Sequence, residues 1–270
     1  MSIRRWYTRE IDSAFWKRWW NSRAEEISSG FELDRVSSLW DKELEEISNK
    51  KLFDFIEPRA DDFIFDAGCG SGANISMLRS KVTGIVGMDF SEAMIDRCRK
   101  RIEEENICSM GLAVGNISHV GLKGNTFNKI ICLSVLHYMN DEECKAALKE
   151  LVRISKEGAI LILHVKNLSS LCLSTRQLAK RIKRWFTRKV VMEHYRTYRW
   201  YRRELSELGG EIVGYDSSNM FVLDFLPKCL YQQLRRVEMK HYKGKFLRKY
   251  GADLKLKVKI RKTKDLMSRE

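Results

Sequence analysis

Two acids and a glycine-rich turn carry the clearest chemistry in this sequence. The turn, Asp66-Ala-Gly-Cys-Gly-Ser-Gly72, follows the apolar run Phe63-Ile-Phe65, which is typical of a buried strand. Alternate glycines allow unusual backbone dihedrals and let a ligand approach the main chain closely. An acid at the strand end suits a cationic group better than a phosphate, and the glycine spacing differs from that of dinucleotide-binding folds. The turn therefore predicts a site for a cationic ligand, with a plain tight turn of small residues as the alternative.

The second acid, Asp89, ends the apolar run 82–88 and follows Asp66 by 23 residues. An acid about 20 residues beyond a glycine turn, at the tip of the next strand, is placed to accept hydrogen bonds from both hydroxyls of a ribose. In this arrangement Asp66 would hold an ammonium group, the glycines an adjacent carboxylate and the ribose, and Asp89 the ribose diol. Together these groups describe S-adenosylmethionine (SAM).

The sequence resembles the class I SAM-dependent methyltransferases over roughly residues 40–165. Besides the glycine turn, the resemblance rests on four segments in the family's order: Gly87-Met-Asp-Phe-Ser-Glu-Ala-Met-Ile95, Gly115-Asn-Ile117, Ile131-Cys-Leu-Ser-Val-Leu-His-Tyr-Met139 and Gly158-Ala-Ile-Leu-Ile-Leu-His164. It implies methyltransferase activity with SAM as the cofactor. It also implies a set of cofactor-binding residues: Asp66, Gly68, Cys69, Gly70, Gly72, Asp89, Phe90, Met94, Asn116, Ile117 and Ser134. Asn116 stands where many relatives carry Asp to receive the adenine amino group, and its amide oxygen can do the same.

A histidine is the best-placed candidate for a catalytic base. Methyl transfer is an in-line displacement, so the protein mainly positions the nucleophile and excludes water. An oxygen nucleophile of high pKa usually also needs a base. His137 ends the expected fourth strand, where related enzymes often place a histidine that faces the cofactor. It is predicted to act as the base or, alternatively, to line the pocket and orient the cofactor, with His164 and His194 as secondary candidates.

The elements that would position these groups alternate along the chain. Strands are expected at 63–66, 82–88, 109–114, 128–134 and 159–165, with helices near 73–80, 92–105 and 142–154 between them. Such alternation predicts an α/β fold with a doubly wound, mostly parallel sheet. A further strand is expected at 210–215. Strict alternation of apolar residues with lysines over 254–260 predicts a half-exposed last strand, and the resemblance implies seven strands with this last one antiparallel beside the sixth.

One domain with helical attachments is expected for 270 residues. Residues 1–60 would form an N-terminal helical cap and 61–165 the SAM-binding Rossmann-like core. Residues 166–270 would add a basic helical insertion before the sixth strand and the C-terminal strands that complete the domain. In the cap, Phe15, Trp16, Trp19 and Trp20 lie at helical spacing. They are interpreted as a hydrophobic anchor, as a lid over substrate or cofactor, or as a membrane-interface cluster.

Positive charge is concentrated after the cofactor motifs. Residues 166–270 carry 27 Lys and Arg against 10 Asp and Glu, whereas the net charge of the whole chain is +14. This asymmetry predicts an anionic acceptor group, nucleic acid or membrane surface as a partner, or else a solvated basic face. Apolar residues from Leu168 to Trp185 recur at helical spacing among Arg and Lys. They predict an amphipathic basic helix over 166–190.

Cysteine usage and hydropathy indicate the compartment. Seven cysteines without a C-x-x-C pair argue against a metal site or a disulfide framework and fit a reducing environment. No apolar run approaches the ~20 residues of a membrane span, and the first residues lack the apolar region of a secretory signal. The expected location is the cytoplasm, with peripheral attachment to an anionic membrane as an option.

Three functions remain compatible with these features. The favoured one is a SAM-dependent methyltransferase that acts by O-methylation on a small-molecule, glycan or lipid-linked acceptor. This acceptor would carry an anionic group. The second is an RNA methyltransferase that uses the basic C-terminal third for phosphate contacts. An Asn/Asp-Pro-Pro-Tyr/Phe motif after the fourth strand is missing, which disfavours base methylation. The third is a non-catalytic SAM-fold binding protein, which the complete glycine turn and both acids disfavour.

Overall fold

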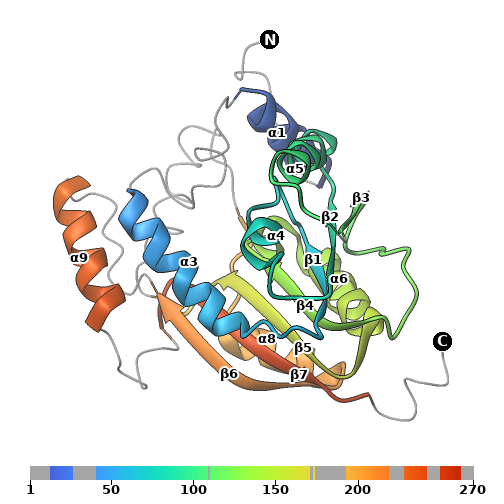
Figure 1. The fold of residues 1–270 in the computed structure, drawn as a ribbon. Coiled ribbons are helices and arrows are strands. Elements are labelled where there is room, and N and C mark those ends of the chain that lie inside the picture. Colours follow the sequence, from blue (N-terminus) through green and yellow to red (C-terminus); the bar gives the residue numbers. More distant parts are fainter. Residues whose placement is uncertain are drawn as a thin grey trace.

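A seven-stranded sheet organises the described part of the chain (Figure 1). The computed structural model describes residues 13–26, 41–108, 110–170, 173, 193–218, 228–241 and 250–262. The strands lie in the order β3-β2-β1-β4-β5-β7-β6. Their bounds are β1 Phe63–Ala67, β2 Gly84–Asp89, β3 Met110–Val114, β4 Phe127–Leu133, β5 Ser155–Lys166, β6 Gly210–Ser218 and β7 Asp253–Ile260.

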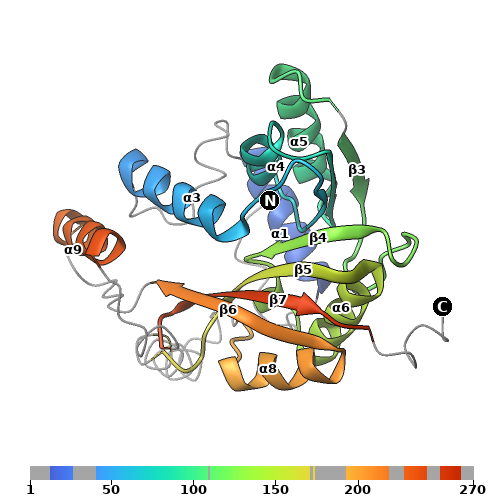
Figure 2. The ribbon, with the colours of Figure 1, turned by 60° about the horizontal axis from the view of Figure 1, so that its bottom comes forward.

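Helices cover both faces of this sheet. Figure 2 shows α3, α4 and α5 on one side and α6 and α8 on the other. The helices are α1 Ser13–Glu26, α3 Lys42–Ile56, α4 Ala73–Leu78, α5 Glu92–Glu104, α6 Asp141–Ile154, α8 Tyr198–Glu207 and α9 Lys228–His241, with a 3₁₀ turn, η2, at Leu136–Tyr138. Two buried apolar clusters fill the layers. One joins α6 and α8 to the sheet, and the other joins α3, α4 and α5 to it.

The expected fold class is confirmed. The pairs β3–β2, β2–β1, β1–β4 and β4–β5 are parallel, so the carboxyl ends of these strands meet at one edge of the sheet. β7 is antiparallel to both of its neighbours, β5 and β6. It therefore begins at the edge where the parallel strands end.

The expectation of a half-exposed last strand is wrong at the beginning of that strand. Lys255 is only 8 % exposed, although Lys259 on the same face is exposed. The apolar and basic residues do alternate, but β7 lies inside the sheet between two strands. Alternation predicts which side chains share a face, and a face stays exposed only when nothing packs on it.

The basic helix expected over 166–190 does not begin at Lys166. β5 continues through Lys166, and Asn167 then forms a bridge with Arg196, so 166–170 are strand end and turn. The rest of that prediction, apart from residue 173, lies outside the described residues. No helix among the described residues is both long and apolar enough to cross a bilayer.

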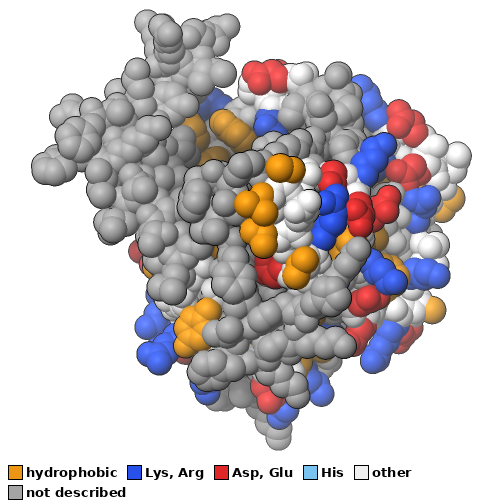
Figure 3. All heavy atoms as spheres, turned by 90° about the vertical axis from the view of Figure 1, so that its left-hand side faces the viewer, with side chains coloured by type: hydrophobic (Ala, Val, Ile, Leu, Met, Phe, Trp, Pro, Cys, Tyr) orange, Lys and Arg blue, Asp and Glu red, His pale blue; other side chains and the backbone are white. Residues whose placement is uncertain are grey.

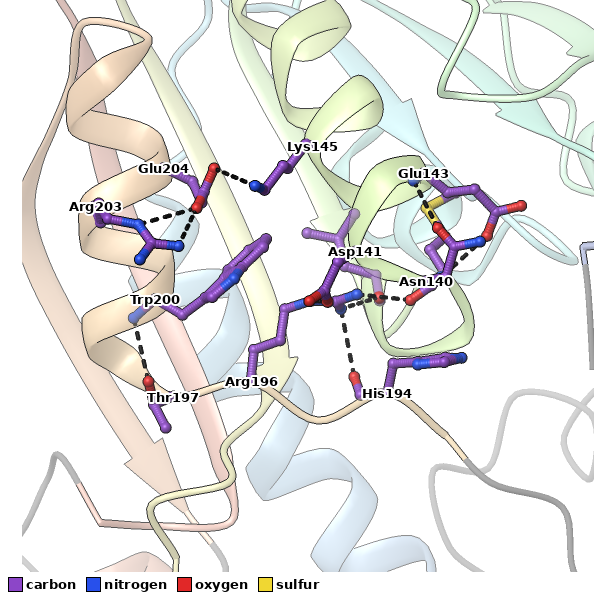
Figure 4. A network of polar contacts seen from close by, with 12 residues as sticks. Asn140, Asp141, Glu143, Lys145, His194, Arg196, Thr197, Trp200, Arg203 and Glu204 are labelled. Carbon is purple, nitrogen blue, oxygen red and sulfur yellow. Dashed lines mark hydrogen bonds and ion pairs between the residues drawn. The ribbon is translucent and has the colours of Figure 1, made fainter.

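The buried side chain of Arg196 ties the segment before α8 to the loop between β4 and α6 (Figure 4). Its Nη1 donates to the carbonyl oxygen of Leu136 at 2.9 Å and its Nη2 to that of Met139 at 2.7 Å. Its Nε donates to Asp141 Oδ1 at 2.8 Å, and the guanidinium lies 4.9 Å from the ring centroid of Trp200. One cation thus fixes the whole turn that contains η2.

Replacing Arg196 by Met should lower the free energy of unfolding by about 2–5 kcal/mol, because two buried carbonyl oxygens lose their donor. Denaturant titration measures the difference. Arg203→Met is the matched control, since Arg203 has a 61 % exposed side chain and pairs with Glu204 on α8. The control should leave the stability nearly unchanged, because solvent screens an exposed ion pair. Equal losses in the two variants would contradict this account of Arg196.

Candidate functional site

The glycine turn between β1 and α4 has three glycines in the left-handed region, at φ 80° for Gly68, 52° for Gly70 and 84° for Gly72. A Cβ built on Gly68 would lie 2.2 Å from Val135 Cγ2, and one on Gly72 would lie 2.6 Å from Cys98 Sγ. A Cβ on Gly70 would meet nothing within 4 Å. Two of the glycines therefore allow the protein to pack against itself. The third leaves open space beside the backbone, where a ligand could approach.

Asp66, at the end of β1, is a fully buried acid without a cation among the described residues. Its Oδ1 has no hydrogen-bond partner there, and its Oδ2 accepts from Asn74 Nδ2 at a long 3.5 Å. Burial raises the pKa of Asp66 to about 7, with a smaller contribution from the charge of Asp89. A carboxylate in this state is stabilised by any ligand that brings a positive charge.

Asp89, at the end of β2, is held in a different way. Its Oδ2 accepts from the backbone N–H of Gly70 at 3.0 Å, and its Oδ1 accepts from that of Ser91 at 2.9 Å. Burial raises the pKa of Asp89, and these backbone hydrogen bonds oppose the rise. Each carboxylate oxygen has a further lone pair, so the group can still accept hydrogen bonds from a diol.

The other predicted cofactor residues lie at or just beyond the carboxyl ends of β1 to β4. Cys69 and Ile117 are buried, and Phe90 is half-buried. Met94 is buried against Ala24 of α1. Asn116 is exposed, and its Oδ1 accepts from the backbone N–H of Ser118 at 2.9 Å, which leaves the second lone pair of that oxygen for another donor.

The N-terminal helix α1 lies across this edge of the sheet, beside α5 (Figure 1). Trp16 is 4 % exposed, and its ring centroid lies 4.5 Å from that of Tyr138, next to η2. Asn21 Oδ1 accepts from the Ser91 hydroxyl at 2.5 Å. Trp16 and Trp20 both contact Tyr138 and therefore anchor the helix beside the candidate site, whereas Trp19 is 40 % exposed.

His137 lies in η2, four residues beyond the end of β4, and is 3 % exposed. Burial lowers its pKa to about 3, and the charge of Lys166 adds to the effect. The Nδ1 atom has no hydrogen-bond partner among the described residues. The ring is neutral at pH 7 and a weak proton acceptor, which suits the pocket-lining alternative better than the role of base.

A second histidine has partners on both sides. His164 Nδ1 lies 2.8 Å from the hydroxyl oxygen of Ser134, and Nε2 lies 3.7 Å from Asp253 Oδ1. Ser134 directly follows β4 and has φ 62°, which turns it out of the sheet plane. Burial lowers the pKa of His164, but Asp253 opposes this shift. The ends of β4 and β5 and the start of β7 thus bring together the hydroxyl of Ser134, the imidazole of His164 and the carboxylate of Asp253. The imidazole lies between the other two groups.

The sequence gives no local signal for Asp253, because its partners lie 87 and 89 residues away. Asp253 forms an ion pair with Lys166, its direct neighbour across β5 and β7. Lys166 and His164 together hold the pKa of Asp253 well below its usual range despite burial. Only the register of β5 with β7 reveals this acid as part of the site.

Comparison with known proteins identifies the core. The family model described as a methyltransferase domain matches residues 64–158, which run from β1 into β5 and include the glycine turn, both acids and η2. The core of this chain is a class I SAM-dependent methyltransferase domain. A methyltransferase domain uses SAM as its methyl donor, and the buried, cation-free Asp66 and the open space at Gly70 fit that sulfonium ligand.

The relatives that this methyltransferase domain matches carry different names. The chain is 34 % identical over 127 residues to an uncharacterised protein of Methanocaldococcus jannaschii. The aligned region covers 47 % of this chain and 50 % of that protein. It is 31 % identical over 142 residues to the Escherichia coli O-antigen chain terminator bifunctional methyltransferase/kinase. This aligned region covers 47 % of this chain and 20 % of that protein. This chain therefore matches half or less of the length of these relatives.

A solved structure extends the likeness to the whole fold. Haemonchus contortus phosphoethanolamine N-methyltransferase 1, in complex with phosphoethanolamine and S-adenosylhomocysteine, superposes with a TM-score of 0.65 at 13 % identity, covering 100 % of this chain and 53 % of that one. At this identity the likeness concerns the fold.

Asp66→Asn should weaken SAM binding by about 10- to 100-fold, because a charge-assisted interaction is replaced by a neutral one of the same size. For the wild type, calorimetry between pH 5.5 and 7.5 should show affinity rising with pH. The carboxyl group of Asp66, with a pKa of about 7, must lose its proton before it can hold a cation.

The Asn variant should lose this pH dependence. Asp96→Asn, which changes an exposed acid on α5 that pairs with Arg99, is the matched control and should behave like the wild type. An unchanged SAM affinity in Asp66→Asn would contradict the assignment of Asp66 to the cofactor.

Proposed function

We propose that this protein transfers the methyl group of SAM to a hydroxyl of a small-molecule, glycan or lipid-linked acceptor that carries an anionic group. The observation that carries the proposal is the line formed by Ser134, His164 and Asp253 at the carboxyl edge of the sheet. It lies at the edge that also holds Asp66 and Asp89, where open α/β sheets place their ligands.

The cofactor would lie along the carboxyl ends of β1 and β2. In this proposal Asp66 holds the positively charged methionine end, and Gly70 allows close approach of the ligand to the backbone. Asp89 accepts hydrogen bonds from the ribose, and Asn116 receives the adenine amino group. Bound SAM supplies a methyl group that is already activated by its sulfonium charge. The protein must then position the acceptor and remove the proton of the acceptor hydroxyl.

The proton of the acceptor hydroxyl would pass to His164 through Ser134. The Ser134 hydroxyl donates its hydrogen bond to Nδ1 when Nε2 carries the proton that faces Asp253. As the acceptor oxygen forms its bond to the methyl carbon, its proton moves to Ser134 Oγ, and the Ser134 proton moves to His164 Nδ1. Asp253 then stabilises the imidazolium, as the carboxylate of a catalytic triad does.

His164→Gln should lower turnover by about 10²- to 10⁴-fold and leave the affinity for SAM unchanged. Because the pKa of His164 lies below 6.5, wild-type activity should fall on the acid side at a pH below 6.5 as the imidazole becomes protonated. The variant should lose this limb of the pH profile. His137→Asn is the comparison, since the low pKa of His137 excludes it from titrating in that range.

The measurement uses methyl-labelled SAM and two fractions of a cell extract, one of small molecules and lipids and one of total RNA. Label in the first fraction, lost in His164→Gln, supports the proposal. Label in the RNA fraction alone would replace it by the RNA methyltransferase alternative. A pH limb that disappears in His137→Asn and persists in His164→Gln would assign the base to His137.

Peripheral contact with an anionic membrane is part of this proposal, and α9 gives it a surface. Hydrophobic and charged side chains share the face that carries α9 (Figure 3). Leu230, Leu234 and Val237 are 41, 42 and 59 % exposed. Their spacing places them on one side of the helix. The charge surplus of the C-terminal third would add attraction to anionic lipids.

Val237→Glu should reduce flotation of the protein with phosphatidylserine-containing vesicles, because it places a carboxylate in the apolar face. Ser206→Glu adds the same charge at an exposed position of α8, away from α9, and serves as the control. Equal flotation of both variants, or none by the wild type at low salt, would reject the membrane contact.

A further inference from the structure

Two rows of polar residues cross β5, β7 and β6 on one face of the sheet. In the first row His164, Lys255 and Asp216 are direct neighbours across the strands, and in the second row Lys166, Asp253 and Ser218 are. Directly opposed residues share a face, and so do residues two apart along a strand. The rows therefore form one polar patch beside the line of Ser134, His164 and Asp253.

Lys255 is the member of this patch whose charge is not paired. Its side chain is buried, with 8 % of the residue exposed, and it makes no hydrogen bond or ion pair within the described residues. By contrast, Lys166 pairs with Asp253. Asp216 lies directly opposite Lys255, and Asp253 is also near, but neither carboxylate forms an ion pair with it among the described residues. An anion bound at this ammonium would therefore add a direct interaction that the described residues do not supply.

Other cations near Lys255 increase this imbalance. Burial lowers the pKa of Lys255, and Lys51 of α3 and Arg235 of α9 lower it further, while Asp216 and Asp253 oppose them. The Arg235 side chain is 2 % exposed and donates to Glu238 at 2.6 Å. Cations of α3 and α9 thus add to the positive charge that acts on Lys255.

The position of Lys255 relates it to the proposed reaction. Lys255 is the direct neighbour of His164, and adjacent strands are about 4.8 Å apart. An anion at Lys255 would therefore lie within a few bonds of a hydroxyl held at Ser134. If Lys255 were an ordinary solvated lysine, its burial and the cations near it would have no explanation.

We infer that Lys255 binds an oxyanion, a phosphate or a carboxylate, of the methyl acceptor, with Arg235 and Lys51 adding positive charge around it. The inference rests on the proposed function for the identity of the bound molecule. It narrows the acceptor to a compound whose anionic group and reacting hydroxyl are close together in the same molecule.

The test uses inorganic phosphate and acetate as separate probes, with calorimetry and thermal unfolding of the full chain. Either probe should bind the wild type and raise its unfolding temperature, because a ligand that binds only the folded state stabilises it. Lys255→Met should weaken that binding by about 10- to 100-fold. Lys255→Arg should restore part of it.

Lys259→Met is the matched control, since Lys259 is an exposed lysine on the same strand and face. It should bind the probe like the wild type. Without any probe, Lys255→Met should unfold at the same temperature as the wild type or a higher one, because an uncompensated buried charge has been removed. A lower unfolding temperature would assign Lys255 to a structural role and overturn the inference.

Failure of both probes to bind the wild type, or equal binding by Lys255→Met, would also overturn it. These outcomes can be distinguished from a failure of the proposed function. Methyl transfer to a neutral small molecule together with absent phosphate and acetate binding would remove only the oxyanion site. Phosphate binding at Lys255 with label entering only RNA would remove the small-molecule acceptor.

Discussion

The antiparallel placement of β7 between β5 and β6 is the constraint on which the proposed acceptor site depends. The parallel strands deliver only their carboxyl ends to the functional edge, and β7 reaches the same edge with its first residues. Asp253 and Lys255 thereby come opposite Lys166 and His164. The backbone register, and no flexible loop, sets the spacing of these charges, which gives the site a rigid support.

Buried polar groups in this fold fall into two kinds. The guanidinium of Arg196 has carbonyl and carboxylate partners for each of its nitrogens and fixes a turn. Asp66 Oδ1 and His137 Nδ1, by contrast, have no partner among the described residues. Since an unmet buried polar group is costly, this second kind marks where a ligand would complete the structure.

The sequence predicted the positions of the glycine turn and of Asp66 and Asp89 better than the cluster around Asp253, for a physical reason. The glycine turn and Asp89 depend on local backbone geometry and on the ends of two successive strands, both of which a short stretch of sequence specifies. The place of the last strand came from the family resemblance. The pairing of Asp253 with Lys166 depends on which residues of two distant strands face each other, and no local pattern contains that register.

Lys255 illustrates the same limit. Its alternation with apolar neighbours correctly predicted a strand, yet it also predicted exposure, whereas the residue is buried. His137 was placed one turn closer to the strand than it is, because the 3₁₀ turn after Leu133 has no distinctive composition. For Lys255 the strand was predictable and the surroundings of the side chain were not, whereas for His137 the short turn itself was not predicted.

The contacts of α1 have a consequence for the timing of catalysis. The helix is joined to the cofactor edge by the ion pair between Lys17 and Glu92 at the surface, the hydrogen bond between Asn21 and Ser91, and the aromatic contact of Trp16 with Tyr138. Asn21 also donates to Glu92, and Arg97 donates to the carbonyl oxygen of Ala24. If the cofactor binds at the carboxyl ends of β1 and β2 as proposed, α1 would lie beside it, and the rate of cofactor exchange would depend on how strongly these contacts hold the helix.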